Sequence, residues 1–396
     1  MAPIRVGVIG AGLAGPVLAT MLKQSGYEPV VCERNPGPSE AGIAIALQLN
    51  GLRILSQIPG LLESMPRFFL DEFHSYSVMP EDLGVLAQLD QPKKLREETG
   101  LGPFGIRRSV LQKKIVEFAE QAGVEFKWGL KLEQLEQLSD GVTVTFADGS
   151  KDTFSFVVGC DGLHSNTRKC LFGESPADYT GLCQTGGYAP TPERLKGKHI
   201  GINLFGDGAH MTIVPVDDET MGFAVTQREP EAKETWRALD SAGVEAFKCS
   251  PVSQWAFDGG ELVRNAFGII KYGLYDRPEL KTWHRGRVIL IGDAAHPTSP
   301  HLGQGANQSF EDADMLVKLL LKHNPSGEDP STATLEVIYS ELEKLRLPRS
   351  SEMVRGARAQ GEKRVVSGVE ECIKRNNYFR ELWSDDKNVH ARLGAA

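Results

Sequence analysis

The sequence predicts an α/β protein in which a parallel-sheet core is interrupted by an inserted antiparallel sheet and followed by a helical C-terminal region. Three observations predict this class. A strand, a glycine-rich turn and a helix open the chain, short apolar strands alternate with turns across residues 179–275, and helical periodicity dominates after Asn307. A length of 396 residues suits two interlocked domains better than one simple core.

The composition limits the classes of partner. Hydrophobic residues make up 41% and charged residues 24% of the chain, which is typical of a soluble globular protein. A net charge of −8 disfavours nucleic acid or an anionic membrane as a general partner. No unbroken apolar stretch of about 18 residues occurs, so no membrane-spanning helix is expected. The six cysteines form no C-x-x-C pair, which predicts no metal site or disulfide framework and favours the cytoplasm.

The first element is a β-α-β unit of about 30 residues. Residues 4–9 are apolar and β-branched, as in a buried parallel strand. Residues 16–25 predict a helix with one apolar face, and Gly26 stands at the usual position for a helix end. Residues 29–32 predict the next strand, which ends at Glu33.

The turn inside this unit is a complete G-x-G-x-x-G between a strand and a helix, the context in which the pattern is informative. The first glycine makes a tight turn, the second lets the backbone approach a pyrophosphate, and the third allows close helix–sheet packing. Glu33, about 18 residues beyond the last glycine, can accept hydrogen bonds from a ribose diol and favours FAD or NAD over NADP. The candidate cofactor residues here are Gly10, Gly12, Leu13, Ala14, Gly15, Glu33 and Arg34.

The middle of the chain predicts further elements of both sheets. Helices are expected at 50–57 and 109–122, and strands at 42–47, 141–146 and 152–158, the last two around an Asp-Gly turn. Residues 66–99 could supply strands of a second sheet, and residues 199–205, 210–216 and 221–226 predict its antiparallel part. A buried strand at 287–291 and a helix at 307–322 return to the core.

Two later motifs decide which dinucleotide the turn holds. One contains Asp161-Gly162, Ser165 and Arg168; the other is Gly292-Asp293-Ala294-Ala295-His296-Pro297, continued by Pro300-His301-Leu302-Gly303-Gln304-Gly305-Ala306-Asn307. Asp293 follows a buried strand, where its carboxylate can accept a hydrogen bond from a ribityl hydroxyl. The small residues after Gly303 open a helix whose N–H groups can face the pyrimidine carbonyl of a flavin.

Together these motifs resemble the group A FAD-dependent monooxygenases of the para-hydroxybenzoate hydroxylase and salicylate hydroxylase type, over residues 4–320. The resemblance implies a Rossmann-like (GR2-type) FAD-binding domain, an inserted antiparallel β-sheet substrate domain and a helical C-terminus. The expected FAD-binding parts are residues 1–75, 105–178 and 276–325; the substrate parts are 76–104 and 179–275; and the C-terminal helical region is 326–396.

The resemblance also implies the chemistry. FAD stays bound, NADH or NADPH docks transiently and reduces it, and a flavin hydroperoxide delivers one oxygen atom from O2 to an aromatic or polycyclic small molecule by hydroxylation or epoxidation. The protein supplies positioning and excludes water. No second nucleotide-binding fingerprint, metal site or Ser-His-Asp set is found in the sequence, as this family would have it.

Several residue roles come from the resemblance alone. Pro300 is expected beside the isoalloxazine, Arg108 at the FAD, Ala46 near the ribose, and Asp161 between the FAD and the nicotinamide cofactor. Arg168 and His296 are expected to be structural. The candidate catalytic residues are Pro300, His301 and His210; further cofactor residues are Asp293, Gly303, Gly305, Ala306 and Asn307; and candidate substrate residues are Met211, Thr212, Val214 and Phe223. For those strand residues, plain sheet core is the competing interpretation.

The sequence departs from part of the family. Gly186 stands where phenol-hydroxylating relatives often carry an arginine, and Val214 where they carry a tyrosine. The alternatives for the substrate are therefore a neutral or polycyclic compound, an alkene to be epoxidised, or an electron-rich aromatic. Two alternatives are a flavin-dependent reductase or oxidase without oxygen insertion, and a non-catalytic GDI-like protein that has lost its flavin. A monomer or weak homodimer is expected.

Overall fold

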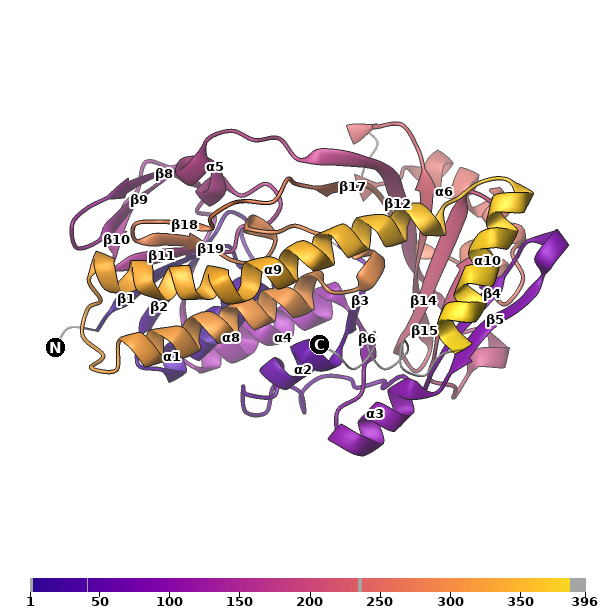
Figure 1. The fold of residues 1–396 in the computed structure, drawn as a ribbon, viewed down its shortest axis with the longest axis horizontal. Helices are drawn as coiled ribbons and strands as arrows, with labels where there is room; N and C mark the ends of the chain where they lie inside the picture. Colours follow the sequence, from indigo (N-terminus) through magenta and orange to yellow (C-terminus); the bar gives the residue numbers. More distant parts are fainter. Residues whose placement is uncertain (1–2, 41, 234–236, 385–396) are drawn as a thin grey trace.

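Two large β-sheets of different construction organise this computed structural model, which describes residues 3–40, 42–233 and 237–384. A six-stranded sheet has the order β18-β19-β11-β1-β2-β7, and an eight-stranded sheet has the order β16-β17-β12-β15-β14-β13-β4-β5. They lie at opposite ends of an elongated molecule, with the six-stranded sheet nearer the N-terminus (Figure 1).

The six-stranded sheet is the predicted parallel core. Its strands are β1 (Arg5–Ile9), β2 (Glu28–Glu33), β7 (Glu125–Trp128), β11 (Phe156–Gly159), β18 (His284–Arg285) and β19 (Val288–Leu290). All neighbours run parallel except β18, which pairs antiparallel with β19 at the edge. Its central strands are apolar and buried because both faces are covered, as parallel sheets require.

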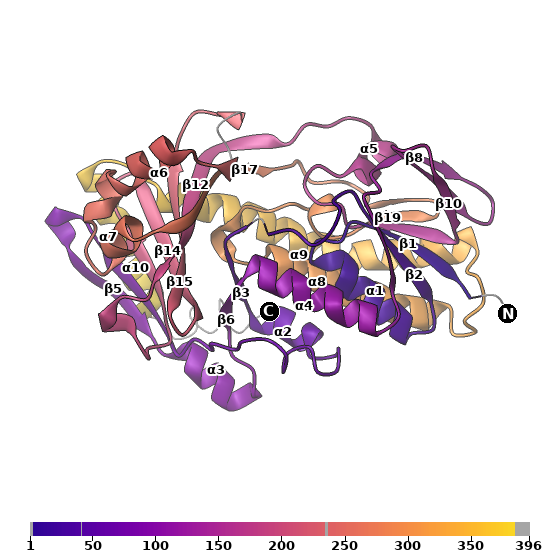
Figure 2. The ribbon, with the colours of Figure 1, turned by 180° about the vertical axis from the view of Figure 1, so that it is seen from behind.

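Helices cover one face of this sheet and a small sheet covers the other. The helices are α1 (Ala14–Gln24), α4 (Arg108–Gln121) and α8 (Gly305–His323), with α2 (Leu49–Leu55) against α8 (Figure 2). The small antiparallel sheet consists of β8 (Leu132–Gln137), β9 (Val142–Phe146) and β10 (Lys151–Phe154). Gly26 adopts a left-handed φ of 88° after α1, as expected for a helix end.

The strand expected at 152–158 is two strands in different sheets. The chain passes from β10 to β11 at Ser155, whose backbone N–H donates to the Arg5 carbonyl at 2.9 Å. The buried Arg287 fixes this crossing, because its Nε donates to the Ser155 carbonyl at 2.6 Å and its Nη2 to the Pro330 carbonyl at 2.8 Å. Local periodicity carries no signal for a bond to a residue so distant in sequence.

The eight-stranded sheet is the inserted sheet. It contains β4 (Glu72–Ser77), β5 (Gly84–Leu89), β12 (Asp178–Pro190), β13 (Ile200–Phe205), β14 (Ala209–Asp217), β15 (Thr220–Arg228), β16 (Arg237–Ala238) and β17 (Phe267–Asp276). It is antiparallel except where β13 and β4 run parallel. Strand β4 crosses the expected boundary at residue 75, so the sheet begins at Glu72.

Helices also occur within and beside the inserted region. α6 (Ser241–Lys248) and α7 (Gly259–Arg264) lie inside a stretch expected to be strands, and α3 (Gln91–Thr99) follows β5. The remaining short elements are β3 (Ala44–Leu47), β6 (Phe104–Arg107) and α5 (Asn166–Phe172). β3 and β6 form a two-stranded ribbon between the large sheets.

The C-terminal region is helical, as predicted. α9 (Thr332–Arg364) runs along the long axis from the six-stranded sheet to the eight-stranded one, and α10 (Val369–Ser384) packs on β5 (Figure 1). Residues 385–396 of the expected helical region lie outside the described residues. Within the described ranges, no helix has the length and apolar character needed to cross a membrane.

Candidate active site

The glycine-rich turn has the geometry that its sequence predicts. Gly10 has a φ of 107°, and a Cβ there would lie 2.6 Å from the Cys160 carbonyl oxygen, so only glycine fits. A Cβ on Gly12 would meet no atom within 4 Å, so the backbone there faces open space. No side chain in the described part of the chain caps the N-terminus of α1 at Leu13. The first N–H groups of α1, including those at Ala14 and Gly15, are therefore suited to an anionic ligand.

Glu33 closes one side of this turn. Its carboxylate accepts hydrogen bonds from the N–H groups of Ala11, at 2.8 Å, and Asn35, at 2.9 Å. Gln112, which the sequence analysis missed, holds the other side: its Nε2 donates to the Ala11 carbonyl at 2.5 Å and its Oε1 accepts from Ser39 N–H at 3.1 Å. The signal that the sequence offered for Gln112 was a glutamine among the apolar positions of the predicted helix at 109–122. Arg34 is exposed beyond the strand end.

Arg108 lies close enough to Asp293 and Glu33 for their charges to interact. Burial lowers the pKa of Arg108, while the carboxylates of Asp293 and Glu33 raise it. Burial raises the pKa of Asp293, whereas His296 and Arg108 lower it. Asp293 is nevertheless exposed to solvent. Gly42 is needed beside Arg108, since a Cβ there would lie 2.6 Å from Arg108 Cδ.

Asp161 lies beside the turn but its oxygens bond within its own loop. They accept hydrogen bonds from Ser165 Oγ at 2.5 Å and from Thr167 N–H at 2.9 Å, at the start of α5. Burial raises the pKa of Asp161, and these hydrogen bonds oppose the rise. Arg168 donates to the Ala295 carbonyl at 3.1 Å, so this loop holds the Asp293 loop in place. Asp161 therefore holds the loop that leads into α5.

The turn before α8 is tied to β3 by amides. Asn307, which is fully buried, donates from Nδ2 to the carbonyls of Gly303, at 2.8 Å, and Ala46, at 3.3 Å, and accepts from Gln48 N–H at 3.1 Å. Gln48 Nε2 donates to the Leu302 carbonyl at 2.9 Å. Periodicity gave no signal for Gln48. These bonds hold Ala46 next to the predicted flavin turn.

This turn also resembles an anion cradle. Gly303 has a φ of 63°, and a Cβ on Gly305 would lie 3.9 Å from Asp293 Oδ1. Among the described residues no side chain caps α8 at Gln304, so the N–H groups near Ala306 resemble those of α1. The start of α8 therefore lies beside Asp293, and Ala14 of α1 lies beside the neighbouring Gly292. This matches the sequence expectation of a flavin ring at α8 and a pyrophosphate at α1.

Pro300 and His301 lie in the one-turn helix before α8. Pro300 is exposed, whereas His301 is only 4% exposed. Burial, and then the positive charge of Arg364, lowers the pKa of His301 to about 3. Its imidazole is therefore neutral near pH 7.

One face of β14 in the eight-stranded sheet carries polar groups. His210 is buried, its Nε2 lies 3.1 Å from Asn203 Oδ1, and Thr212 donates to the same oxygen at 3.3 Å. Burial lowers the pKa of His210 well below its usual value, helped by Arg364 and by His301. Val214 is on this face too, since a Cβ on Gly105 would lie 3.1 Å from its Cγ2.

Met211 and Phe223 lie on the opposite face, where they were not expected. Both are buried in the core that the sheet forms with α6 and α7. The Phe223 ring stacks on Phe247 at 6.4 Å between centroids, and a Cβ on Gly259 would lie 3.6 Å from Met211 Sδ. Because side chains alternate along a strand, these two cannot share a wall with His210 and Thr212. The competing interpretation, sheet core, fits them.

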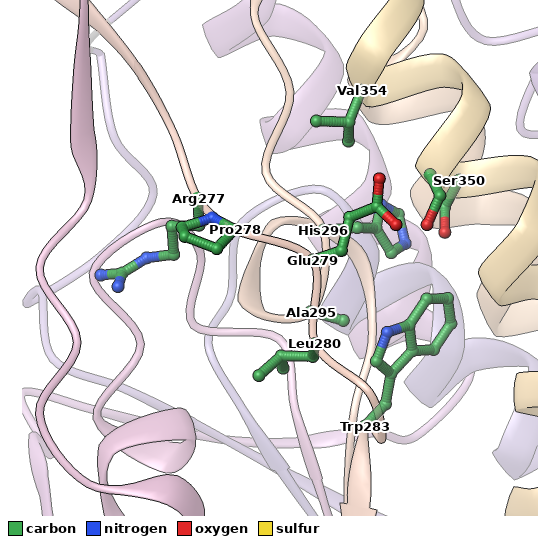
Figure 3. A pocket seen from close by; sticks show the side chains of 10 residues that line it. Arg277, Pro278, Glu279, Leu280, Trp283, Ala295, His296, Ser350 and Val354 are labelled. Atoms are coloured by element: carbon green, nitrogen blue, oxygen red, sulfur yellow. The ribbon is translucent and has the colours of Figure 1, made fainter.

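His296 is held by a buried carboxylate. Its Nε2 lies 2.6 Å from Asp312 Oδ2, which also accepts from Gly292 N–H at 2.9 Å. Burial tends to raise the pKa of Asp312, but His296 and Arg346 lower it to about 2. The α9 side of this loop carries a small pocket lined by Trp283, His296 and Ser350, with the Arg277 side chain extending away from it (Figure 3). Asp293 and Gly303 do not line that pocket, so it is separate from the turn before α8.

His210 and His301 predict a change of stability with pH. Both stay neutral in the folded chain but titrate near pH 6.5 when unfolded, so the unfolded state alone binds protons as the pH falls. Stability is then fully present above pH 6.5 and declines below it. From pH 7.5 to 5.5, His301 should account for about 1.4 kcal/mol of lost unfolding free energy.

Urea unfolding of the wild type and of His301→Gln at both pH values measures this contribution. The variant should lose less stability on acidification than the wild type. Equal losses in both proteins would contradict a neutral buried His301.

Known proteins share this architecture. The family described as FAD binding domain matches residues 3–332. The 3-amino-4-hydroxybenzoate 2-monooxygenase of Streptomyces cremeus is 30% identical over 385 residues, covering 95% of this chain and 92% of that protein. The 6-hydroxynicotinate 3-monooxygenase of Pseudomonas fluorescens is 28% identical over 355 residues, covering 85% and 88%. A variant of Klebsiella pneumoniae HpxO complexed with FAD has a TM-score of 0.80 at 25% identity, covering 96% of this chain and 94% of its own.

Proposed function

Because this chain belongs to the FAD-binding-domain family and is an FAD-dependent monooxygenase, we propose that it hydroxylates a small substituted aromatic ring between the Pro300 turn and the eight-stranded sheet. The observation that carries this proposal is the pair of buried neutral histidines. His301 on the turn and His210 on the sheet lie close enough for His301 to lower the pKa of His210. Between them they offer hydrogen bonds without a charge.

The residues around the glycine-rich turn and Asp293 fit FAD. Gly12 leaves room for a pyrophosphate, Glu33 suits a ribose diol, and Asp293 offers an accessible carboxylate for a ribityl hydroxyl. The chemistry supplied by bound FAD is acceptance of hydride from NADH or NADPH and activation of O2. The proposed set of further contacts is Gly10, Leu13, Ala14, Gly15, Arg34, Ala46, Arg108, Asp161, Gly303, Gly305, Ala306 and Asn307.

The protein residues would hold the ring and keep water out. Pro300 is exposed on its turn and would contact both the isoalloxazine ring of FAD and the ring of the substrate. His210 and His301, both neutral, would hydrogen-bond to ring substituents. Thr212 and Val214 would form the wall beside them, while the absence of an arginine at Gly186 argues against a phenolate held by a guanidinium there.

The names of two relatives support a monocyclic aromatic substrate for the proposed reaction. They are described as acting on 3-amino-4-hydroxybenzoate and 6-hydroxynicotinate. The reductase, oxidase and GDI-like alternatives have no support among these relatives. A cytoplasmic location and a monomer or weak homodimer complete the proposal; the six free cysteines suit a reducing compartment.

Turnover with isotopically labelled oxygen tests the function. Purified protein should be yellow, and one substituted aromatic should accelerate both flavin reduction by NADH or NADPH and the incorporation of one atom of ¹⁸O2 into product. His301→Ala and His210→Ala should lower kcat/KM, whereas Met211→Leu, a volume-conserving core change, should leave it nearly unchanged. Flavin reduction without oxygen incorporation for any aromatic tested would instead favour an oxidase or reductase.

A further inference from the structure

The centre of the eight-stranded sheet carries three partly exposed residues on one face. Asn203, Thr212 and Ala224 are cross-strand neighbours on β13, β14 and β15. All three are partly exposed, whereas the residues directly before and after each of them are buried. Because side chains alternate between the two faces of a sheet, this exposure belongs to a single face, the one that carries His210. We call these three residues the open strip.

Buried residues bound the open strip at both ends. Gly186 extends the same row on β12 and Ser75 extends it on β4, and both are buried. Ile43 covers the Gly186 end, since a Cβ on Gly186 would lie 3.0 Å from Ile43 Cδ1. Neighbouring strands are about 4.8 Å apart, so the open strip is about 10 Å long. Its length therefore suits one aromatic ring that carries a substituent.

Asn203 is the polar end of the open strip. Its Oδ1 accepts a hydrogen bond from Thr212 Oγ1 at 3.3 Å and lies 3.1 Å from His210 Nε2. These two contacts orient the amide with its oxygen toward β14. The Nδ2 group carries two N–H donors, and within the described part of the chain it donates to no residue. A partly exposed amide nitrogen here is therefore suited to a ligand group that accepts hydrogen bonds.

Positive charge surrounds this end of the sheet. Burial, and then the charges of Arg364, His301 and Arg375, lower the pKa of His210. The Arg375 guanidinium lies 5.4 Å from the centre of the Phe205 ring, which in turn lies 4.7 Å from the His210 ring. Arg375 donates to neutral acceptors, the Gly206 carbonyl at 2.9 Å among them. A positive field beside a free donor favours an anionic acceptor over a neutral one.

We propose that Asn203 is a specificity-determining residue, whose Nδ2 donates to a carboxylate on the aromatic substrate. The ring would then lie along Thr212 and Ala224. This inference rests on the proposed function, because it gives the substrate of that reaction a recognised group. A carboxylate held at the β13 end would fix which ring positions face the flavin.

Two substitutions at Asn203 separate its donor from its shape. Asn203→Asp keeps an oxygen for Thr212 and His210 and replaces the donor with a charged acceptor of nearly the same volume. Asn203→Ala removes the donor without adding charge. Gln227→Glu is the matched control: it also changes an amide into a carboxylate, but on the opposite face of β15, where residue 227 follows the buried Val225 in the alternation.

Calorimetric titration of the FAD-loaded full chain with 4-hydroxybenzoate and with 4-hydroxybenzylamine tests the proposal, because the two probes differ only in the substituent and its charge. The wild type should prefer the carboxylate. Asn203→Ala should weaken that preference by about tenfold, the value of a hydrogen bond to a charged group, and Asn203→Asp by more. Gln227→Glu should keep it within about twofold, since solvent screens an exposed charge on the far face.

Three results would overturn the inference. One is a wild type that binds the amine as tightly as the carboxylate, or binds neither probe. Another is an Asn203→Ala protein that retains FAD and keeps the wild-type preference, whatever happens to Asn203→Asp. The third is an equal loss of preference in Gln227→Glu, which would show a general effect of charge. If the wild type still inserts labelled oxygen into another aromatic, the proposed function stands and only the role of Asn203 fails.

Discussion

Replacing Gly15 with alanine is expected to abolish FAD retention and also to destabilise the apoprotein, whereas replacing Gly12 is expected to remove FAD alone. A Cβ on Gly15 would collide with the Gly10 carbonyl oxygen, within the turn itself. Forcing an extra methyl group into such a contact costs about 1–3 kcal/mol of unfolding free energy. A Cβ on Gly12 meets nothing within 4 Å in the free chain, so it interferes only when a pyrophosphate approaches.

Independent measurements of FAD retention and of stability distinguish the effects of Gly15→Ala and Gly12→Ala. The ratio of flavin absorbance to protein absorbance after gel filtration reports FAD retention, and urea unfolding of the apoproteins reports stability. Both variants should lose the yellow colour, but only Gly15→Ala should unfold at lower urea concentration. A yellow Gly12→Ala protein would mean that the backbone at Gly12 does not approach the cofactor.

Replacing Arg346 with methionine is expected to cost about 3–5 kcal/mol of unfolding free energy, because it removes the buried guanidinium that pairs with Asp312 Oδ1. Arg346 Nε donates to Asp312 Oδ1 at 2.8 Å, its Nη2 donates to Gln308 Oε1 at 2.7 Å, and its Nη1 donates to Glu311. Its side chain is 5% exposed, and that of Asp312 is fully buried. Because Asp312 also holds Gly292 N–H, the loop that carries Asp293 should shift and FAD should bind more weakly.

Arg349 provides the control for this prediction. It also binds Glu311, at 2.9 and 3.0 Å, but its side chain is 34% exposed and does not contact Asp312. Arg349→Met should therefore cost no more than about 1 kcal/mol, as for a partly solvated ion pair. Urea unfolding and FAD titration of both variants measure the two effects. Similar losses in both would show that the Asp312 contact adds nothing to stability.

The backbone geometry of the glycine-rich turn was predictable from the sequence because its determinants are local. The turn around Gly10 requires left-handed backbone and close packing, which only glycine allows, so its spacing is visible in the chain. Asp293 stands three residues after the buried strand β19, and Gly303 stands two residues before helix α8. The family motifs then identified FAD, which composition and periodicity alone had left open against NAD.

Other parts depended on contacts between residues far apart in sequence. Gln48 holds the turn before α8 through a bond to Leu302, and Gln112 holds the glycine-rich turn through a bond to Ala11. No local sequence pattern encodes these bonds. The break at Ser155 depends on Arg287, and the start of the inserted sheet at Glu72 depends on pairing with β13. Each of these is a tertiary interaction that overrides or extends a local preference.

In the inserted eight-stranded sheet, too, local sequence decided some features of single residues and tertiary contacts decided others. The sequence by itself determined that a strand at 210–216 would belong to the inserted sheet, because alternation and flanking turns are properties of that segment. Only the tertiary structure decided what each face of the sheet contacts: it set His210 and Thr212 beside Asn203 and buried Met211 and Phe223 against α6 and α7. The reason is that both faces of this strand are buried, so polarity along the chain cannot tell one from the other until the partners of each face are known.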